Sequence, residues 1–200
     1  MTPKIDRLTA QVLAAALTLS GTVACSTQTV SNPGGEAAQA KTTSPEMVTT
    51  FECVSRDRGW ATIAHRGNIV SKSPLITWNS LEFGSDYTPE KRCEIVSGKL
   101  TQAVAQNGGT LTGLNLTTGN VDDGQTVVCL VASGQSRCDR NNMLFTLNRE
   151  NAKKPTHALS KITNFAQGKA TNSTVDESRF PSLISLEMLV ERSLPKDNGF

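Results

Sequence analysis

The chain has 200 residues, and its 20 Lys and Arg residues nearly balance 18 Asp and Glu residues, so the formal net charge is +2 at pH 7. Because the basic residues are interspersed with acidic ones, we expect no basic face dense enough to bind a nucleic acid. This length suits one domain with a substantial core, and no second folded domain is needed.

The first 24 residues have the pattern of a secretory signal. Lys4 and Arg7 precede an apolar segment, residues 8–24, that ends in small residues, which is the order found in signal peptides. A membrane-spanning helix needs about 20 apolar residues in a row, and polar residues between Thr9 and Thr22 interrupt this segment. We therefore predict a signal peptide at residues 1–24 and an exported protein.

Cys25 follows Thr22-Val23-Ala24, in the position at which a bacterial lipoprotein precursor is cleaved and its cysteine takes a diacylglycerol. Thr22 stands where Leu is commoner, and the alternative is a chance cysteine in a leader that is cut elsewhere. Each buried CH₂ of an acyl chain contributes ~0.8 kcal/mol to membrane binding. Lipidation at Cys25 would therefore make membrane lipid the first partner of the protein.

Residues 25–47 hold this cysteine and a predicted flexible tether. The segment is rich in Ser, Thr, Gly, Ala and Gln, so it cannot bury enough apolar surface to offset the entropy lost on ordering. A coil of about 20 residues spans roughly 25 Å. We expect a single domain at residues 48–195, a tail at residues 196–200, and a protein partner on or near the membrane.

The domain begins with strand patterns. Alternating or β-branched segments separated by turn residues predict strands at Thr50–Val54, Trp60–Ala64 and Pro74–Trp78, with a turn at Arg56–Gly59. Trp60 and Trp78 could form a face on which a ligand stacks, but a tryptophan in a strand is more often part of the core.

Thr88 begins the clearest helix. Its side chain can cap the helix, Pro89 fits the first helical position, and Glu90 suits the positive end of the helix dipole. Apolar residues then recur at helical spacing until Asn107-Gly108-Gly109. We predict a helix at Pro89–Gln106 whose apolar stripe packs on the sheet.

A three-stranded meander follows this helix. It is predicted at Leu114–Thr118, Gln125–Val131 and Asn142–Leu147, with a turn at Asp122-Asp123-Gly124. Calcium binding by Asn120, Asp122 and Asp123 is the alternative reading of the turn, but the loop is short and lacks the distal Glu of an EF-hand.

The C-terminal part contains a second, shorter helix. It begins near Pro155, carries Leu159, Ile162 and Ala166 on one face and ends at Gly168. A loop at residues 169–179 leads to an edge strand at Leu183–Leu186 and a turn of helix at Glu187–Arg192, or to one amphipathic helix over the same residues. The expected fold is α+β, with a small, mostly antiparallel sheet and the two helices packed on it.

Four of the five cysteines lie in the predicted domain, and an even number in an exported protein favours disulfides. Three pairings are possible. We favour Cys129 with Cys138, which flank a Ser133-Gly134 turn, and therefore Cys53 with Cys93. No Cys-x-x-Cys occurs, so a redox or metal site is not expected.

Candidate catalytic residues are few. His65 and His157 are the two histidines, and neither has metal-ligand spacing. The sequence lacks Gly-x-Ser-x-Gly and the glycine-rich nucleotide motifs. The carboxylates are too scattered for their spacing to pair them, and a glycosidase dyad stays open only because such pairs meet in three dimensions; it has no positive support. We therefore expect no enzyme activity and no cofactor.

Several segments occur together in a specific order: Thr50-Phe51-Glu52-Cys53, Pro74-Leu75-Ile76-Thr77-Trp78, Tyr87-Thr88-Pro89-Glu90-Lys91-Arg92-Cys93, Thr117-Thr118-Gly119, Val127-Val128-Cys129, and Cys138 ahead of Leu144-Phe145-Thr146-Leu147. With these segments the chain resembles the circadian oscillating protein family of cyanobacteria over nearly all of Thr50–Leu194. The resemblance implies an exported or membrane-associated cyanobacterial protein. From the family, only the cysteine positions can be transferred to this chain, and no catalytic residues can.

Three hypotheses of function follow. The first is a noncatalytic lipoprotein that binds an envelope or thylakoid-lumen protein through an exposed apolar patch. The second is a small-molecule or glycan binder with a pocket that uses Trp60, Trp78 or Tyr87. The third is a hydrolase with a cleft in which His65 or His157 meets a serine or an acid.

Overall fold

The computed structural model describes residues 48–166, 168 and 182–195. The predicted signal peptide, Cys25, the tether, the loop at residues 169–179 and the tail at residues 196–200 lie outside these ranges. Among the described residues, no helix is both long enough and apolar enough to cross a bilayer. Helices and antiparallel sheets occur together, which confirms the α+β class.

The N-terminal strands form sheet A. β1 (Thr49–Arg56) and β2 (Gly59–Arg66) make a hairpin, and β2 also pairs with β3 (Ile69–Val70) and β4 (Ile76–Trp78). Three of these strands and the first turn were predicted, whereas the two residues of β3 are too few to show a pattern. Gly59 has a φ of +130°, and a Cβ there would collide with the carbonyl oxygen of Trp78, so the turn requires glycine.

The remaining strands form sheet B, in the order β7 (Met143–Thr146), β6 (Thr126–Val131), β5 (Asn115–Asn120) and β8 (Leu183–Ser185). All its pairs are antiparallel, and the predicted meander is confirmed. β8 lies at the edge, directly before α4 (Leu186–Ser193). The predicted edge strand followed by a helix is therefore confirmed, and the alternative of one continuous helix is wrong.

α1 (Pro89–Gln106) has the predicted bounds, and the Thr88 side chain accepts a hydrogen bond from the Lys91 backbone N–H at 3.2 Å. α3 (Pro155–Ala166) is also confirmed. Two short elements were not predicted, the 3₁₀ helix η2 (Ser85–Tyr87) and α2 (Arg149–Lys153). The second of these depends on Asn148, whose side chain caps it through the Asn151 N–H.

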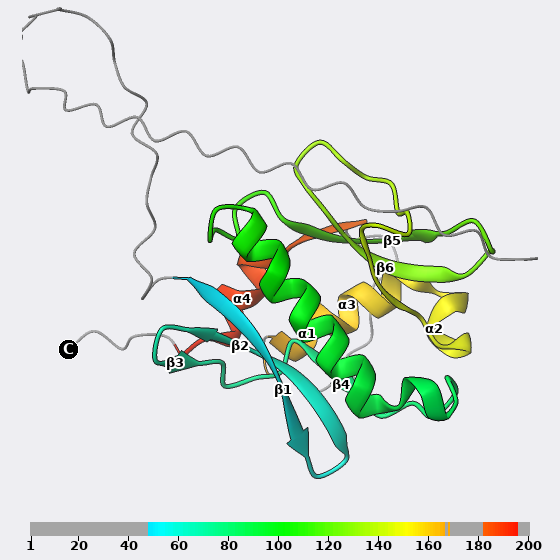
Figure 1. Ribbon diagram of the computed structural model, residues 1–200, viewed down its shortest axis with the longest axis horizontal. Helices are drawn as coiled ribbons and strands as arrows, with labels where there is room; N and C mark the ends of the chain where they lie inside the picture. The colour runs from blue at the N-terminus through cyan, green and yellow to red at the C-terminus, as the bar shows by residue number, and fades with distance from the viewer. Residues whose placement is uncertain (1–47, 167, 169–181, 196–200) are drawn as a thin grey trace, which may run out of the picture. The chain divides into compact units, whose positions relative to one another are not determined.

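The two sheets share one apolar core. α1 packs on β1 and β2 and also contacts β7, and Figure 1 shows this helix running past the strands of both sheets. The core cluster draws on both sheets and on three helices, with buried members that include Phe51, Leu75, Leu100, Leu116, Val128, Leu144, Leu159 and Leu189. The sequence pattern had suggested one small sheet. The strands instead form two sheets, which residues 79–114, with α1 among them, connect.

Both favoured disulfides are present. Cys53–Cys93 joins β1 to α1, with Cα atoms 5.5 Å apart. Cys129–Cys138 joins β6 to the loop that follows it, with Cα atoms 5.7 Å apart. The second disulfide covers a small cluster of Val121, Val127 and Val131 on the other face of sheet B. These disulfides are consistent with an exported protein.

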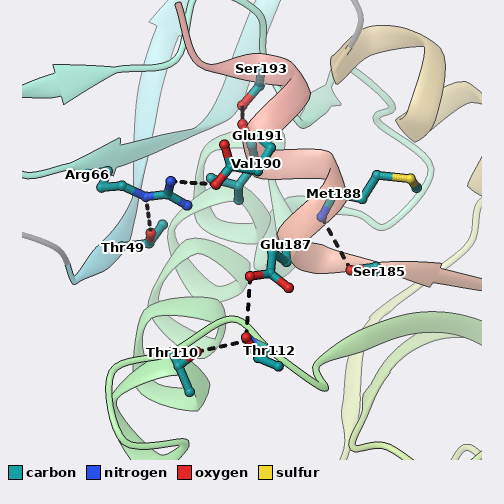
Figure 2. A network of polar contacts seen from close by, with 10 residues as sticks. All are labelled: Thr49, Arg66, Thr110, Thr112, Ser185, Glu187, Met188, Val190, Glu191 and Ser193. Carbon is teal, nitrogen blue, oxygen red and sulfur yellow. Dashed lines mark hydrogen bonds and ion pairs between the residues drawn. The ribbon is translucent and has the colours of Figure 1, made fainter. Parts of the chain in front are cut away.

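α4 connects parts of the fold that are distant in the sequence (Figure 2). Glu191 forms an ion pair with Arg66 of β2, and Glu187 accepts a hydrogen bond from Thr112 at 3.3 Å. Ser185 caps the helix through the Met188 N–H. The helix therefore links sheet A, the segment before β5, and the edge of sheet B.

Candidate binding groove

The three aromatic residues proposed as ligand contacts do not form one stacking face. Trp60 and Trp78 are paired across β2 and β4, but Trp78 is only 3% exposed. Its Nε1 donates to Thr62 Oγ1 at 3.0 Å, and its ring meets Phe145 edge to face at 5.0 Å. Trp78 is therefore a core residue that joins the two sheets. Tyr87, in contrast, is 55% exposed at the end of η2.

Two hollows lie along α1, and a third adjoins them at Arg92. The middle hollow, of about 630 Å³, shares Arg92 with a hollow of about 260 Å³ on one side and Lys99 with a hollow of about 530 Å³ on the other. Arg92 and Lys99 are seven residues apart, and Gln106, seven residues further, lines the third hollow. Residues at this spacing lie on the same face of a helix. We call the three hollows together the α1 groove.

The middle hollow is mainly apolar. One wall consists of the α1 residues Arg92, Ile95, Val96 and Lys99, and the opposite wall of β7, residues 143–146, with Phe83 and Tyr87 at one end. Of its lining residues, Ile95 is 37% exposed and Tyr87 is 55% exposed. These side chains give the groove an exposed apolar border of the kind found at protein interfaces.

Arg92 fixes the segment before α1 to the helix. Its Nη2 donates to the Ser80 carbonyl oxygen at 2.5 Å and its Nε donates to the Tyr87 carbonyl oxygen at 3.1 Å. The guanidinium carbon lies 4.5 Å from the centre of the Phe83 ring, where a cation and an aromatic face attract each other. Burial lowers the pKa of Arg92 from its ordinary value. Two of the five guanidinium donors are used in this way.

Lys99 lies against the β7 edge of sheet B. Its Nζ donates to the carbonyl oxygens of Met143 at 2.8 Å and Leu144 at 3.4 Å, both in the edge strand β7. Burial lowers the pKa of this ammonium group as well. Within the described ranges, neither Lys99 nor Arg92 forms an ion pair with a carboxylate.

Neither cation was predicted from the sequence to line a groove. Their spacing of seven residues beside the apolar stripe of α1 was a signal for a shared helix face. It could not show that β7, about fifty residues later in the chain, forms the opposite wall.

The histidines lie outside the groove. His65 Nε2 is 2.7 Å from Glu52 Oε2 on neighbouring strands of sheet A, and neither residue lines any of the three hollows. His157 lies in the first turns of α3. In the part of the chain that the structure describes, no three His, Cys, Asp or Glu side chains are grouped so as to hold a metal ion. Asp122 and Asp123 instead lie 3.9 and 3.6 Å from the Arg140 guanidinium group.

The comparisons with known proteins point to one family. The model of the family described as Circadian oscillating protein COP23 matches residues 50–191, which include all the residues that line the middle hollow. No curated protein and no solved structure matches the chain significantly.

Proposed function

The chain belongs to the circadian oscillating protein COP23 family, and we propose that it is a noncatalytic, membrane-tethered binding domain that docks an envelope or thylakoid-lumen protein in the α1 groove. The observation that carries the proposal is the apolar middle hollow with its exposed border. Exposed apolar side chains that gather around a hollow typically mark an interaction surface.

The dimensions of the groove favour a protein over a small molecule. From Arg92 to Gln106 the helix rises about 20 Å, at 1.5 Å per residue, which is the length of a short peptide segment. The hollow next to Trp78 has about 260 Å³, slightly below the roughly 300 to 1,000 Å³ of ordinary small-molecule sites, whereas the other two hollows, of about 630 and 530 Å³, fall inside that range. The length of the groove along the helix, and not the volume of its hollows, is therefore what favours a protein segment. Because Trp78 is buried, its ring face is not available for stacking on a sugar or a flat ligand.

The side chains of the middle hollow suit binding better than acid–base catalysis. Its lining is aliphatic, aromatic, amide, hydroxyl and cationic, and it holds two cations that are already engaged with carbonyl oxygens. General acid–base or nucleophilic chemistry needs a base within hydrogen-bond reach of a reacting group. The close pair of His65 and Glu52 lies elsewhere, on sheet A.

The tether is the second part of the proposal. Signal cleavage before Cys25, lipidation of its thiol and a flexible segment up to residue 47 would keep the groove close to a cyanobacterial membrane, on its periplasmic or lumenal side. The two disulfides support an oxidising compartment of this kind. A partner in or on the same membrane would then meet the groove at a high local concentration.

Photo-cross-linking in cyanobacterial cells tests the proposal. A photoreactive amino acid is placed at Ile95 in the groove or, as the matched control, at Ile69 in β3, whose exposure of 42% is close to the 37% of Ile95. We expect one abundant partner to be captured from position 95 and not from position 69, and we expect Cys25→Ala to reduce the yield. The same products from both positions would contradict a docking role for the groove.

A further inference from the structure

We infer that the partner segment in the α1 groove is an acidic amphipathic helix, with two carboxylates that reach Arg92 and Lys99 and apolar side chains between them. This inference rests on the proposed function and names the chemistry of the partner. It is carried by the positions of two cations at the two ends of one apolar hollow.

The charges of the groove are incompletely satisfied. Arg92 and Lys99 are half-buried and donate to backbone carbonyl oxygens, which carry only partial charge. No carboxylate of the described residues pairs with either cation. A half-buried cation that has no anionic partner is stabilised when a ligand brings an anion to it. Donors remain for this purpose, because the described residues engage only two of the five guanidinium donors.

Both cations are partly desolvated by burial. Burial lowers the pKa of Arg92 and of Lys99, so the surrounding protein disfavours their positive charge. A carboxylate within about 4 to 6 Å would favour the charged form. The two groups are therefore positioned to prefer an anionic occupant over a neutral one.

The partner segment needs apolar side chains because the surface between the two cations is apolar. Ile95, which is exposed, lies between Arg92 and Lys99 on α1, and the partly exposed Met143 and Phe145 of β7 also line the hollow. Methionine and aromatic side chains are enriched at protein interfaces because they offer a large, adaptable contact area. An occupant that carried charge alone would leave this surface exposed to water.

Lys99 also determines how the segment binds. An extended peptide in the groove could add to the β7 edge of sheet B only by bonding to the outward backbone groups of β7. Lys99 already donates to the carbonyl oxygens of Met143 and Leu144, and a lysine at an edge strand opposes such pairing. A helix bound through its side chains avoids this conflict. Seven residues of helix rise about 10 Å, so carboxylates seven positions apart on the partner match Arg92 and Lys99.

A displayed library of random peptides of about 16 residues, long enough for four helical turns, tests the inference. It is selected against the full chain with both disulfides formed, and selected peptides are measured on the variants Lys99→Gln, Ile95→Asp and Ile69→Asp. Lys99→Gln removes the charge but keeps N–H donors for the β7 carbonyl oxygens. Arg92 is not the first choice, because its loss could release the segment before α1. Thermal unfolding establishes that each variant is folded.

We expect enriched peptides with paired Asp or Glu residues seven positions apart and apolar residues between them. Lys99→Gln and a rise from about 50 to about 500 mM NaCl should each weaken their binding about tenfold. Ile95→Asp should abolish binding, and Ile69→Asp should leave it unchanged.

The opposing results separate the two proposals. Peptides without acidic residues that still depend on Ile95 would overturn the acidic helix and leave the groove as a docking site. Peptides that bind the Ile95→Asp variant normally would overturn both. If no peptide is enriched over an empty support, the acidic helix is overturned, and the cross-link from position 95 still decides the proposed function.

Discussion

The two faces of α1 differ in composition and in what they contact. Cys93, Val96, Leu100 and Val104 are at most 1% exposed and pack in the core. Arg92, Ile95 and Lys99 are partly or largely accessible and line the groove. One helix thus provides both a part of the core that holds sheet A and a wall of the candidate site.

The difference shows how the site can be rigid without being buried. The core face is fixed to sheet A by the Cys53–Cys93 disulfide and by the hydrogen bond from Ser97 Oγ to Thr62 Oγ1 at 3.1 Å. Thr101 adds contacts with the backbone of Phe51. Side chains on a helix that is held in this way keep their positions relative to β7, as a preformed groove requires. Substitutions on the core face should therefore change stability, and those on the groove face should change binding.

The largest expected effect comes from the disulfide on the core face. Cys53 and Cys93 enclose a sequence separation of 40 residues, whereas Cys129 and Cys138 enclose 9. In the chain-entropy model, replacing both cysteines of a pair with alanine should cost about 4 kcal/mol for the first disulfide and about 3 kcal/mol for the second. Urea unfolding of both double variants measures the difference, and a larger loss for Cys129 and Cys138 would contradict it.

Leu100→Ala and Ile95→Ala compare the two faces directly. Leu100 is 1% exposed, so its truncation leaves a cavity and should lower the free energy of unfolding by about 3 kcal/mol. Ile95 is 37% exposed and should lose no more than about 1 kcal/mol, because much of its surface already meets water. Denaturant melts of the two variants test this, and equal losses would mean that Ile95 is packed as a core residue.

Arg92→Lys should have a smaller effect on stability. Lysine keeps the charge but loses the planar group that bonds to Ser80 and Tyr87 and stacks on Phe83. We expect a loss of about 1 kcal/mol and faster proteolytic cleavage within residues 79–88. Lys91→Arg, at the neighbouring exposed position, serves as the control. Unchanged cleavage in Arg92→Lys would show that the segment is held by other contacts.

The features of the fold that were predicted correctly are those that residues close together in the sequence determine. The bounds of α1 depend on Thr88, Pro89 and Asn107, all local, and they were predicted correctly. The turn signal between Cys129 and Cys138 likewise led to the correct pairing, and elimination then identified the other disulfide. α2 was missed because its cap, Asn148, precedes only five helical residues, too few for periodicity to show.

The groove was less predictable because its two walls come from distant parts of the chain. Trp60, Trp78 and Tyr87 were proposed as ligand contacts because of residue type alone. The structure buries Trp78 in the core, leaves Trp60 outside the three hollows and places Tyr87 at one end of the middle hollow. Arg92 and Lys99 look like ordinary surface charges in the sequence, and only the packing of α1 beside β7 gives them a shared apolar hollow.

The smallest expected effect is the pH dependence that Lys99 gives to stability. Burial lowers the pKa of Lys99 from its ordinary value of 10.5, so the unfolded chain holds the proton at alkaline pH values at which the folded chain has begun to release it. Where the unfolded state binds more protons, the free energy of unfolding rises with pH. The contribution of Lys99 should therefore increase with pH up to about 10.5 and be constant well below the lowered pKa.

Lys99→Gln isolates this contribution from those of the other titrating groups. Urea unfolding of the chain and of the variant at about pH 8 and about pH 10 should give a stability difference that shifts in favour of the unmodified chain at the higher pH. The shift should be small, because Lys99 is only half-buried and solvent screens its charge. A difference that does not change with pH, or that moves the other way, would mean that water solvates the ammonium group as fully in the groove as in the unfolded chain. Desolvation of Lys99 would then no longer support the inference that the partner is acidic.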